Sequence, residues 1–288
     1  MLEQENVDQD RLGNNNQTPL GWAAENGNEG VVKLLLELEN VNPDHPGNNN
    51  RTPLWWAAIN GHEGVVKLLL EQENVEPDRL DKDGYGPLGL AAFHGHEGVV
   101  MLLLERGIVD PNHPEKNDLT LLGLAALNGH EGLVKLLLEQ ENVEPDRLDE
   151  YGYGPLGLAA FHGHDGVVKL LLDNGVVDCN RPSIADHTPL ANAAINGHEG
   201  VVKLLLEQEH VDPDRPDSNG RTPLVWATTK RHEGIVKLLL DRRDVDPNRL
   251  DKHGRTLLSY ASKERHEGIM QLFQTRKSVE TPDARLSH

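Results

Sequence analysis

Apolar and polar positions repeat along this chain with a period of 34 residues, in eight copies that follow one another without insertion or gap. A fixed period of about 20–50 residues is typical of a solenoid, whose units bury their apolar faces only against their neighbours. Such a protein offers a long surface, so the pattern predicts binding before it predicts catalysis. One leucine and one glycine mark every copy: Leu20, Leu54, Leu88, Leu122, Leu156, Leu190, Leu224 and Leu258, and Gly30, Gly64, Gly98, Gly132, Gly166, Gly200, Gly234 and Gly268.

Each copy contains the pattern of two short helices. In the second copy, Thr52 is placed as an N-cap and Pro53 as the first helical residue, where a missing N–H does no harm. Apolar residues at i, i+3 and i+4 follow, and Gly61 ends the helix because glycine readily adopts the left-handed conformation. A second apolar helix is predicted from about Glu63. It ends before Pro77, since proline cannot continue a helix.

This order of elements, with the signature T-P-L-x-x-A-A-x-x-G-H, resembles the ankyrin repeat family over residues 8–279. The resemblance implies an all-α, curved and elongated solenoid of eight helix-turn-helix units with β-hairpin-like loops. It would form one domain, 1–279, with a tail at 280–288. The 34-residue period and the V-D-P-D segment resemble fungal ankyrin arrays, which often follow signalling or nucleotide-binding domains. The expected units are 8–41, 42–75, 76–109, 110–143, 144–177, 178–211, 212–245 and 246–279.

The net charge of the chain indicates which classes of partner are favoured. The chain carries 47 acidic and 28 basic residues, a net charge of −19. Such a surface repels phosphate backbones, which disfavours nucleic acid and favours a basic protein partner. The single cysteine fits a reducing compartment. No apolar run is long enough to cross a membrane, and the N-terminus does not resemble a signal peptide, so we expect a cytoplasmic or nuclear protein.

The N-terminus repeats the end of a second helix, because residues 2–7 copy residues 70–75. The chain thus begins where a preceding repeat should finish, as a fragment of a longer array or a gene cut from one would. We expect a monomer, with self-association through the open N-terminal repeat face as the alternative.

Three features suggest chemistry, and each has a structural explanation. Seven histidines at one position, from His62 to His266, cannot converge on one metal ion, because neighbours in stacked repeats lie about 10 Å apart. We expect them to tie the turn between helices to backbone. The acidic segment Asp212–Gly220 lacks the spacing of a calcium loop. Cys179 has no partner motif for a nucleophile. We therefore predict no enzyme activity, metal or cofactor.

Two exposed rows vary between copies. At the hairpin tip one position runs from Gln17 to Arg255, and at the end of the first helix another runs from Glu25 to Lys263. Five consecutive apolar members of the helix row would form an interaction strip, with the inter-repeat core as the alternative. Resemblance to ankyrin proteins places both rows on the concave face. The candidate partner-binding residues are Trp55, Ile59, Tyr85, Phe93, His94, Leu127, Tyr153, Phe161, His162 and Ile195.

One further row is expected to be core, because tryptophan takes the place of leucine in it: Trp22, Trp56, Leu90, Leu124, Leu158 and Trp226. Asn192 is the polar exception. A local hydrogen bond is the simplest account of it, and a gap used by water or a ligand is the alternative.

The sequence thus favours a non-catalytic protein-interaction scaffold. Two alternatives stay open: a structural or orphan array without a selected ligand, and the recognition fragment of a larger signalling or NTPase receptor.

Overall fold

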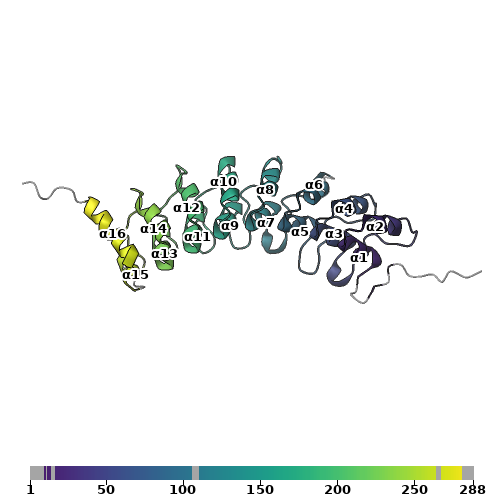
Figure 1. The fold of residues 1–288 in the computed structure, drawn as a ribbon, viewed down its shortest axis with the longest axis horizontal. Helices are drawn as coiled ribbons and strands as arrows, with labels where there is room; N and C mark the ends of the chain where they lie inside the picture. The colour runs from purple at the N-terminus through teal and green to yellow at the C-terminus, as the bar shows by residue number, and fades with distance from the viewer. Residues whose placement is uncertain (1–9, 11, 14–16, 106–109, 264–266, 281–288) are drawn as a thin grey trace, which may run out of the picture. The chain divides into compact units, whose positions relative to one another are not determined.

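The computed structural model describes residues 10, 12–13, 17–105, 110–263 and 267–280. The chain divides into two compact units, residues 1–150 and 151–288, and each is built of paired α-helices (Figure 1). The described ranges contain no strand, and the expected all-α repeat fold is confirmed. The single domain at 1–279 stays a prediction. The copied N-terminal segment and residues 281–288 of the expected tail lie outside the described residues.

The described residues of unit 1 form four helix pairs and two short 3₁₀ turns. The first helices of the pairs pack on one another in chain order, as α1 on α3, α3 on α5 and α5 on α7, and the second helices form a parallel row. The elements are α1 (Pro19–Glu25), α2 (Glu29–Leu36), η1 (Asn48–Asn50), α3 (Pro53–Ile59), α4 (Glu63–Leu70), α5 (Pro87–His94), α6 (Glu97–Glu105), η2 (Lys116–Asp118), α7 (Leu121–Asn128) and α8 (Glu131–Leu138).

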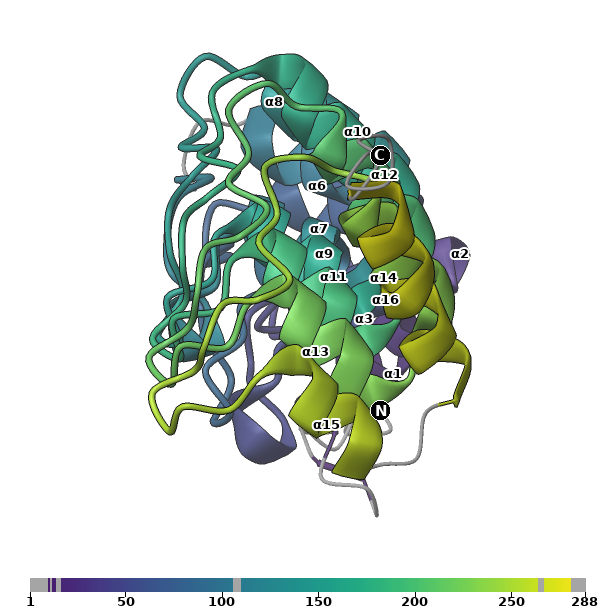
Figure 2. The same cartoon turned by 90° about the vertical axis from the view of Figure 1, so that its left-hand side faces the viewer.

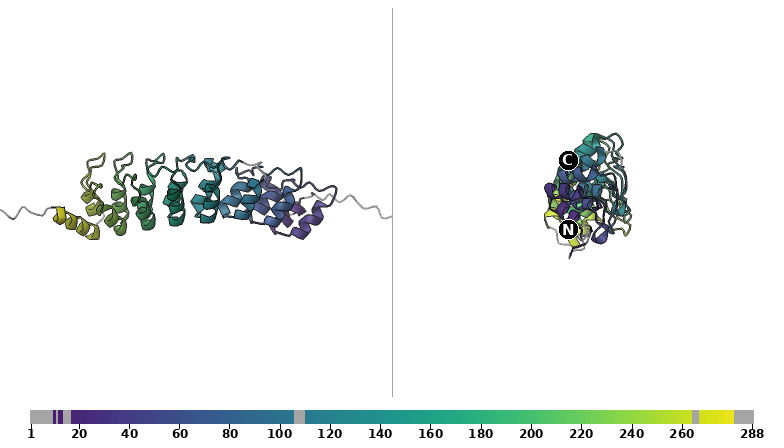
Figure 3. Two further views of the ribbon diagram at one scale, coloured as in Figure 1. Left: turned by 90° about the horizontal axis from the view of Figure 1, so that it is seen from above. Right: turned by 90° about the vertical axis from the view of Figure 1, so that its right-hand side faces the viewer.

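Unit 2 repeats the same arrangement. Seen end-on, its loops lie along one side of its helices (Figure 2), and from above they stand in a row (Figure 3). The elements are α9 (Pro155–His162), α10 (Asp165–Asn174), α11 (Pro189–Asn196), α12 (Glu199–Leu206), α13 (Pro223–Lys230), α14 (Glu233–Leu240), α15 (Leu257–Lys263) and α16 (Glu267–Glu280). No helix in the described residues of either unit is long and apolar enough to cross a membrane.

The first helices begin and end as their sequence predicts. The Thr52 hydroxyl accepts a hydrogen bond from Trp55 N at 3.2 Å, which satisfies one of the free N–H groups at the start of α3. Glycines with positive φ follow the ends of α5, α7, α9 and α11. After α13 the same left-handed position is held by Arg231, with φ 66°. The paired alanines of α1, α3, α5, α7, α9 and α11 are fully buried, which lets neighbouring helices approach closely.

Within each unit, histidines of the regular row join a repeat to the one before it. Within unit 1, Nε2 of His62, His96 and His130 lies 2.8–3.0 Å from the carbonyl oxygens of Glu25, Ile59 and Phe93. In unit 2, His198 and His232 bond the carbonyls of Phe161 and Ile195 at 3.0 and 3.1 Å. The expected structural role is confirmed for these five histidines. His266 lies outside the described residues. Each bond holds the last turn of a first helix, where the variable row lies.

Candidate partner-binding surface

The variable row at the end of the first helices is only partly covered. In unit 1, Ile59, Phe93 and Leu127 are half-buried and His94 is exposed. The Phe93 and His94 rings meet edge to face with centroids 5.1 Å apart, and His94 stacks on His96 at 5.9 Å. These three apolar side chains occupy equivalent positions on α3, α5 and α7, helices that pack on one another. We call Ile59, Tyr85, Phe93, His94 and Leu127 the aromatic surface of unit 1.

Unit 2 carries a cluster of the same kind with an additional contact from a tyrosine ring. Phe161 is 39% exposed at the end of α9, and its ring contacts Tyr153 of the preceding loop at 6.1 Å between centroids. His162 lies 5.1 Å from Phe161 and stacks on His164 at 6.1 Å. Ile195 is half-buried at the equivalent position of α11. We call Tyr153, Phe161, His162 and Ile195 the aromatic surface of unit 2.

Both exposed histidines are kept neutral by their surroundings. Partial burial lowers the pKa of His94, and the neighbouring imidazoles of His96 and His130 lower it further. Burial likewise lowers the pKa of His162, assisted by His164 and His198. At neutral pH these rings therefore extend the apolar character of the surface instead of adding positive charge.

Residues of the hairpin-tip row take part in contacts between aromatic rings and basic side chains. Tyr85 is half-buried, with the Lys116 ammonium 5.5 Å from its ring. In unit 2, the Arg221 guanidinium lies 3.9 Å over the Trp226 ring, and the His187 ring meets the same indole at 5.4 Å. The Arg221 guanidinium is held over an indole of α13, an arrangement that stabilises this loop against the helix.

Trp55, expected on the accessible surface, is instead buried, with 3% of its area exposed. Its ring packs edge to face on Trp56 at 4.8 Å and is covered by the Arg51 guanidinium at 4.2 Å. The position is also buried in the other copies up to Val225, although Ser259 in the last copy is exposed. A Cβ at Gly21 would meet Gln17, and one at Gly157 would meet Tyr153. The prediction that Trp55 is a partner-binding residue is therefore wrong.

In the row of Trp22, Trp56 and Trp226, the tryptophans are more exposed than the sequence predicts. Trp22 is 55% exposed, and Trp56 and Trp226 are only half-buried. Leu90, Leu124 and Leu158 are buried as expected. An indole is larger than a leucine side chain and extends beyond the space between stacked first helices, which explains the difference.

Asn192 is fully buried in α11, and neither its Oδ1 nor its Nδ2 has a hydrogen-bond partner among the described residues. The expected local hydrogen bond is therefore wrong. The side chain is enclosed because α11 packs against both α9 and α13.

Glu115 is a buried residue that the sequence analysis did not single out. In α5 the N-cap threonine is replaced by Gly86, and the Glu115 carboxylate from the next loop accepts the Gly86 N–H at 2.9 Å and also bonds Gly89 N. A side chain at Gly89 would overlap this carboxyl. Burial raises the pKa of Glu115 to about 7, against the lowering effect of these two bonds.

In the acidic segment of the seventh repeat, Asp217 forms hydrogen bonds within its own turn. Asp217 accepts hydrogen bonds from Asn219 N, Arg221 N and Arg221 Nε at 2.8–3.1 Å. Across the described residues, no group of three or more His, Cys, Asp or Glu side chains is arranged to hold a metal ion. Burial, with the charge of Asp178, raises the pKa of Cys179, which disfavours the reactive thiolate.

Comparison with known proteins identifies the repeat. The sequence matches the family model described as ankyrin repeats (3 copies) over residues 1–81, 37–114, 88–183 and 190–283. The crystal structure of the human ASB11 ankyrin repeat domain is similar, with a TM-score of 0.68 and 26% sequence identity over 76% of this chain and 97% of that chain. No protein with a curated description matches.

Proposed function

Since this chain belongs to the ankyrin repeat family, we propose that it is a non-catalytic module that binds a partner protein on the face formed by its hairpin tips and first helices. That face is concave in ankyrin proteins. The two aromatic surfaces defined above are the proposed contact sites, one in each unit.

The observation that carries this proposal is the cluster around Phe161. A phenylalanine that is 39% exposed, in contact with Tyr153 and His162, presents apolar area that water solvates poorly. Rings of this kind are common binding hot spots, because they bury much area at little conformational cost. In unit 1, Phe93 and His94 make the same contact between a phenylalanine and a histidine ring.

The backbone beneath these rings is held in place before any partner arrives. His130 bonds the Phe93 carbonyl, and His198 bonds the Phe161 carbonyl. Less conformational freedom is then lost on binding, which favours affinity. The net charge of −19 favours a partner with a basic surface, which would be attracted at long range.

Replacing both phenylalanines, Phe93→Ala with Phe161→Ala, is expected to weaken partner binding at least about tenfold while the helical circular dichroism stays unchanged. The measurement is affinity capture from lysate, followed by titration of the captured protein against both forms. Leu34→Ala is the matched control, since Leu34 is 65% exposed on α2, away from the first helices. Equal binding by the double variant and wild type would favour an array without a ligand on this face. Loss of helical signal would mean that the rings are core.

A further inference from the structure

Two hairpin tips of unit 2 carry large apolar side chains that are not among the candidate residues above. Ile184 is 74% exposed, and Tyr151 on the preceding tip is 48% exposed. Single exposed apolar residues are common on soluble proteins, but two on successive loops that break the polar pattern of the repeat need an explanation. At the position of Ile184 every other copy has a polar residue: Asn14, Asn48, Lys82, Lys116, Glu150, Ser218 and Lys252.

The fold of the loops does not require these side chains. Ile184 N donates to the Tyr151 carbonyl at 3.0 Å and so joins two successive tips. Lys252 N makes the same bond at 3.0 Å in unit 2, and Lys82 N makes it at 2.9 Å in unit 1. Since lysine serves this backbone bond as well as isoleucine does, the apolar side chain of Ile184 has no part in closing the loop.

Ile184 instead extends the aromatic surface of unit 2. A Cβ at Gly152 would lie 3.3 Å from Ile184 Cγ2, so the isoleucine side chain lies beside the bare backbone of Gly152. The next residue, Tyr153, contacts the Phe161 ring with centroids 6.1 Å apart. The apolar surface therefore continues from the end of α9 across one loop to the tip of the next.

The counterpart in unit 1 ends in charged groups. Lys116 takes the place of Ile184, and its ammonium lies 5.5 Å from the Tyr85 ring. Asp83 takes the place of Tyr151 and accepts a hydrogen bond from Arg51 Nη2 at 3.4 Å. The two units thus share the ring pair of phenylalanine and histidine, while only unit 2 continues it with apolar side chains over the tips.

Charge next to these tips in the chain is acidic. Residues 149–153 and 183–187 include three acids and no lysine or arginine, whereas residues 81–85 and 115–119 of unit 1 include two lysines. One of the acids, Asp186, is exposed two residues after Ile184. An apolar surface beside exposed carboxylates is complementary to apolar side chains that have basic neighbours.

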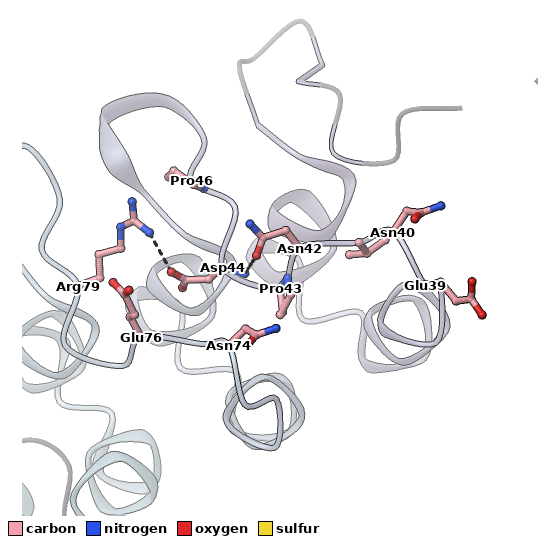
Figure 4. Close-up of a pocket in the computed structure, with 10 residues that line it drawn as sticks. Glu39, Asn40, Asn42, Pro43, Asp44, Pro46, Asn74, Glu76 and Arg79 are labelled. Carbon is pink, nitrogen blue, oxygen red and sulfur yellow. Dashed lines mark hydrogen bonds and ion pairs between the residues drawn. The ribbon is translucent and has the colours of Figure 1, made fainter. Parts of the chain in front are cut away.

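The groove between the loops that follow α2 and α4 of unit 1 lacks such features (Figure 4). Arg79 Nη1 donates to Asp44 Oδ2 across it at 2.9 Å. The same pair recurs in unit 2, where Arg249 Nη1 donates to Asp214 Oδ2 at 3.2 Å. An ion pair found in both units serves to join successive loops, so this groove belongs to the scaffold of the repeat.

We propose that the aromatic surface of unit 2 extends over Tyr151 and Ile184, and that it binds a partner segment in which large apolar side chains alternate with lysine or arginine. The apolar side chains cover Phe161 and Ile184, and a basic side chain pairs with Asp186. This inference rests on the proposed function and adds the chemistry of the partner to it.

The test is a titration of the full chain with the peptide Ac-Lys-Leu-Lys-Leu-Lys-NH₂, followed by ¹H–¹⁵N NMR. Shift changes are expected at residues 151–153, 161–162 and 184–187. Replacing both leucines of the peptide by serine, or its three lysines by glutamate, is expected to weaken binding at least about tenfold. Equal binding of the serine or the glutamate peptide, or shift changes confined to other surfaces, would overturn the proposal.

Ile184→Ser removes the apolar side chain without changing the charge, and it is expected to weaken the leucine peptide about fivefold or more. Leu250→Ser is the matched control, because Leu250 is an exposed apolar loop residue of the same unit, and it is expected to change affinity less than about twofold. Both positions are exposed, so the helical circular dichroism should stay unchanged. Equal effects of the two variants would mean that the peptide binds apolar surface without preference and would contradict the proposal.

Phe161→Ala separates this inference from the proposed function. If Phe161→Ala weakens the peptide and Ile184→Ser does not, the extension over the tips is wrong and the contact at the end of α9 stands. If neither variant weakens it, the proposed contact site of unit 2 is wrong as well.

A transfer of the tips to unit 1 tests the same claim by gain of binding. The triple variant Lys82→Glu, Asp83→Tyr and Lys116→Ile gives unit 1 the side chains of unit 2 at these positions. We expect the wild type to bind one leucine peptide per chain and the triple variant to bind two, with new shift changes at residues 82–85, 93–94 and 116–119. A folded triple variant that still binds one peptide would show that Tyr151 and Ile184 do not determine the site.

Discussion

The contribution of Glu115 to the free energy of unfolding is expected to fall as pH rises from about 4.5 to about 7, and Glu115→Gln is expected to remove that contribution. The folded-state pKa of Glu115 is raised by burial from 4.5 to about 7, with the Asp81 charge adding to the rise and the Gly86 and Gly89 N–H groups opposing it. Between these two values the folded chain binds the extra proton, so stability is present below pH 4.5 and is lost as pH rises through about 7.

The expected size of this effect is about 3 kcal/mol at most, since one pKa unit corresponds to about 1.4 kcal/mol. Urea unfolding at pH 5 and pH 8 measures it as the difference between wild type and Glu115→Gln. Ser183→Ala is the control, because Ser183 takes the position of Glu115 in unit 2 and does not titrate. Identical pH dependence in wild type and Glu115→Gln would show that the carboxyl is already ionised at pH 5.

Gly95→Ala is expected to destabilise the chain by about 3 kcal/mol, and Gly84→Ala by about 1 kcal/mol. Both glycines have positive φ, 74° and 86°, so both substitutions carry the cost of the left-handed conformation. At Gly95 a Cβ would also lie 2.6 Å from His130 Nδ1, whereas nothing lies within 4 Å at Gly84. The added methyl at 95 must therefore displace the histidine that holds the Phe93 carbonyl.

Urea unfolding of the two variants measures the difference directly. A larger loss for Gly95→Ala assigns roughly 2 kcal/mol to the contact with the next repeat. Equal losses would mean that the imidazole moves aside without cost, and the histidine row would then contribute little to joining the repeats.

The helices themselves could be predicted from sequence because their signals are local. Thr52 and Pro53 start α3, and the Gly95 position ends α5, through interactions within a few residues of the chain. The histidine bonds were also predictable in kind, since a regular row in a stacked array can reach only its neighbours. The resemblance to fungal arrays stays a prediction.

The contacts made between a loop and the next repeat could not be predicted in the same way. Whether Trp55 is covered depends on the Arg51 side chain above it, and whether Trp22 is covered depends on the width of the space between helices. Glu115 reaches Gly86 across 29 residues. Burial at these positions is set by side-chain size and by long-range packing, and neither appears in the 34-residue pattern.

Contact between a partner protein and the end of the first helices can be measured by site-specific photo-cross-linking. Benzoylphenylalanine would be placed at Phe161 in one chain and at Leu34, exposed on the second-helix side, in another. We expect a covalent adduct with one partner protein from position 161 and none from position 34. An adduct from position 34 alone would place the partner on the other face and contradict the account.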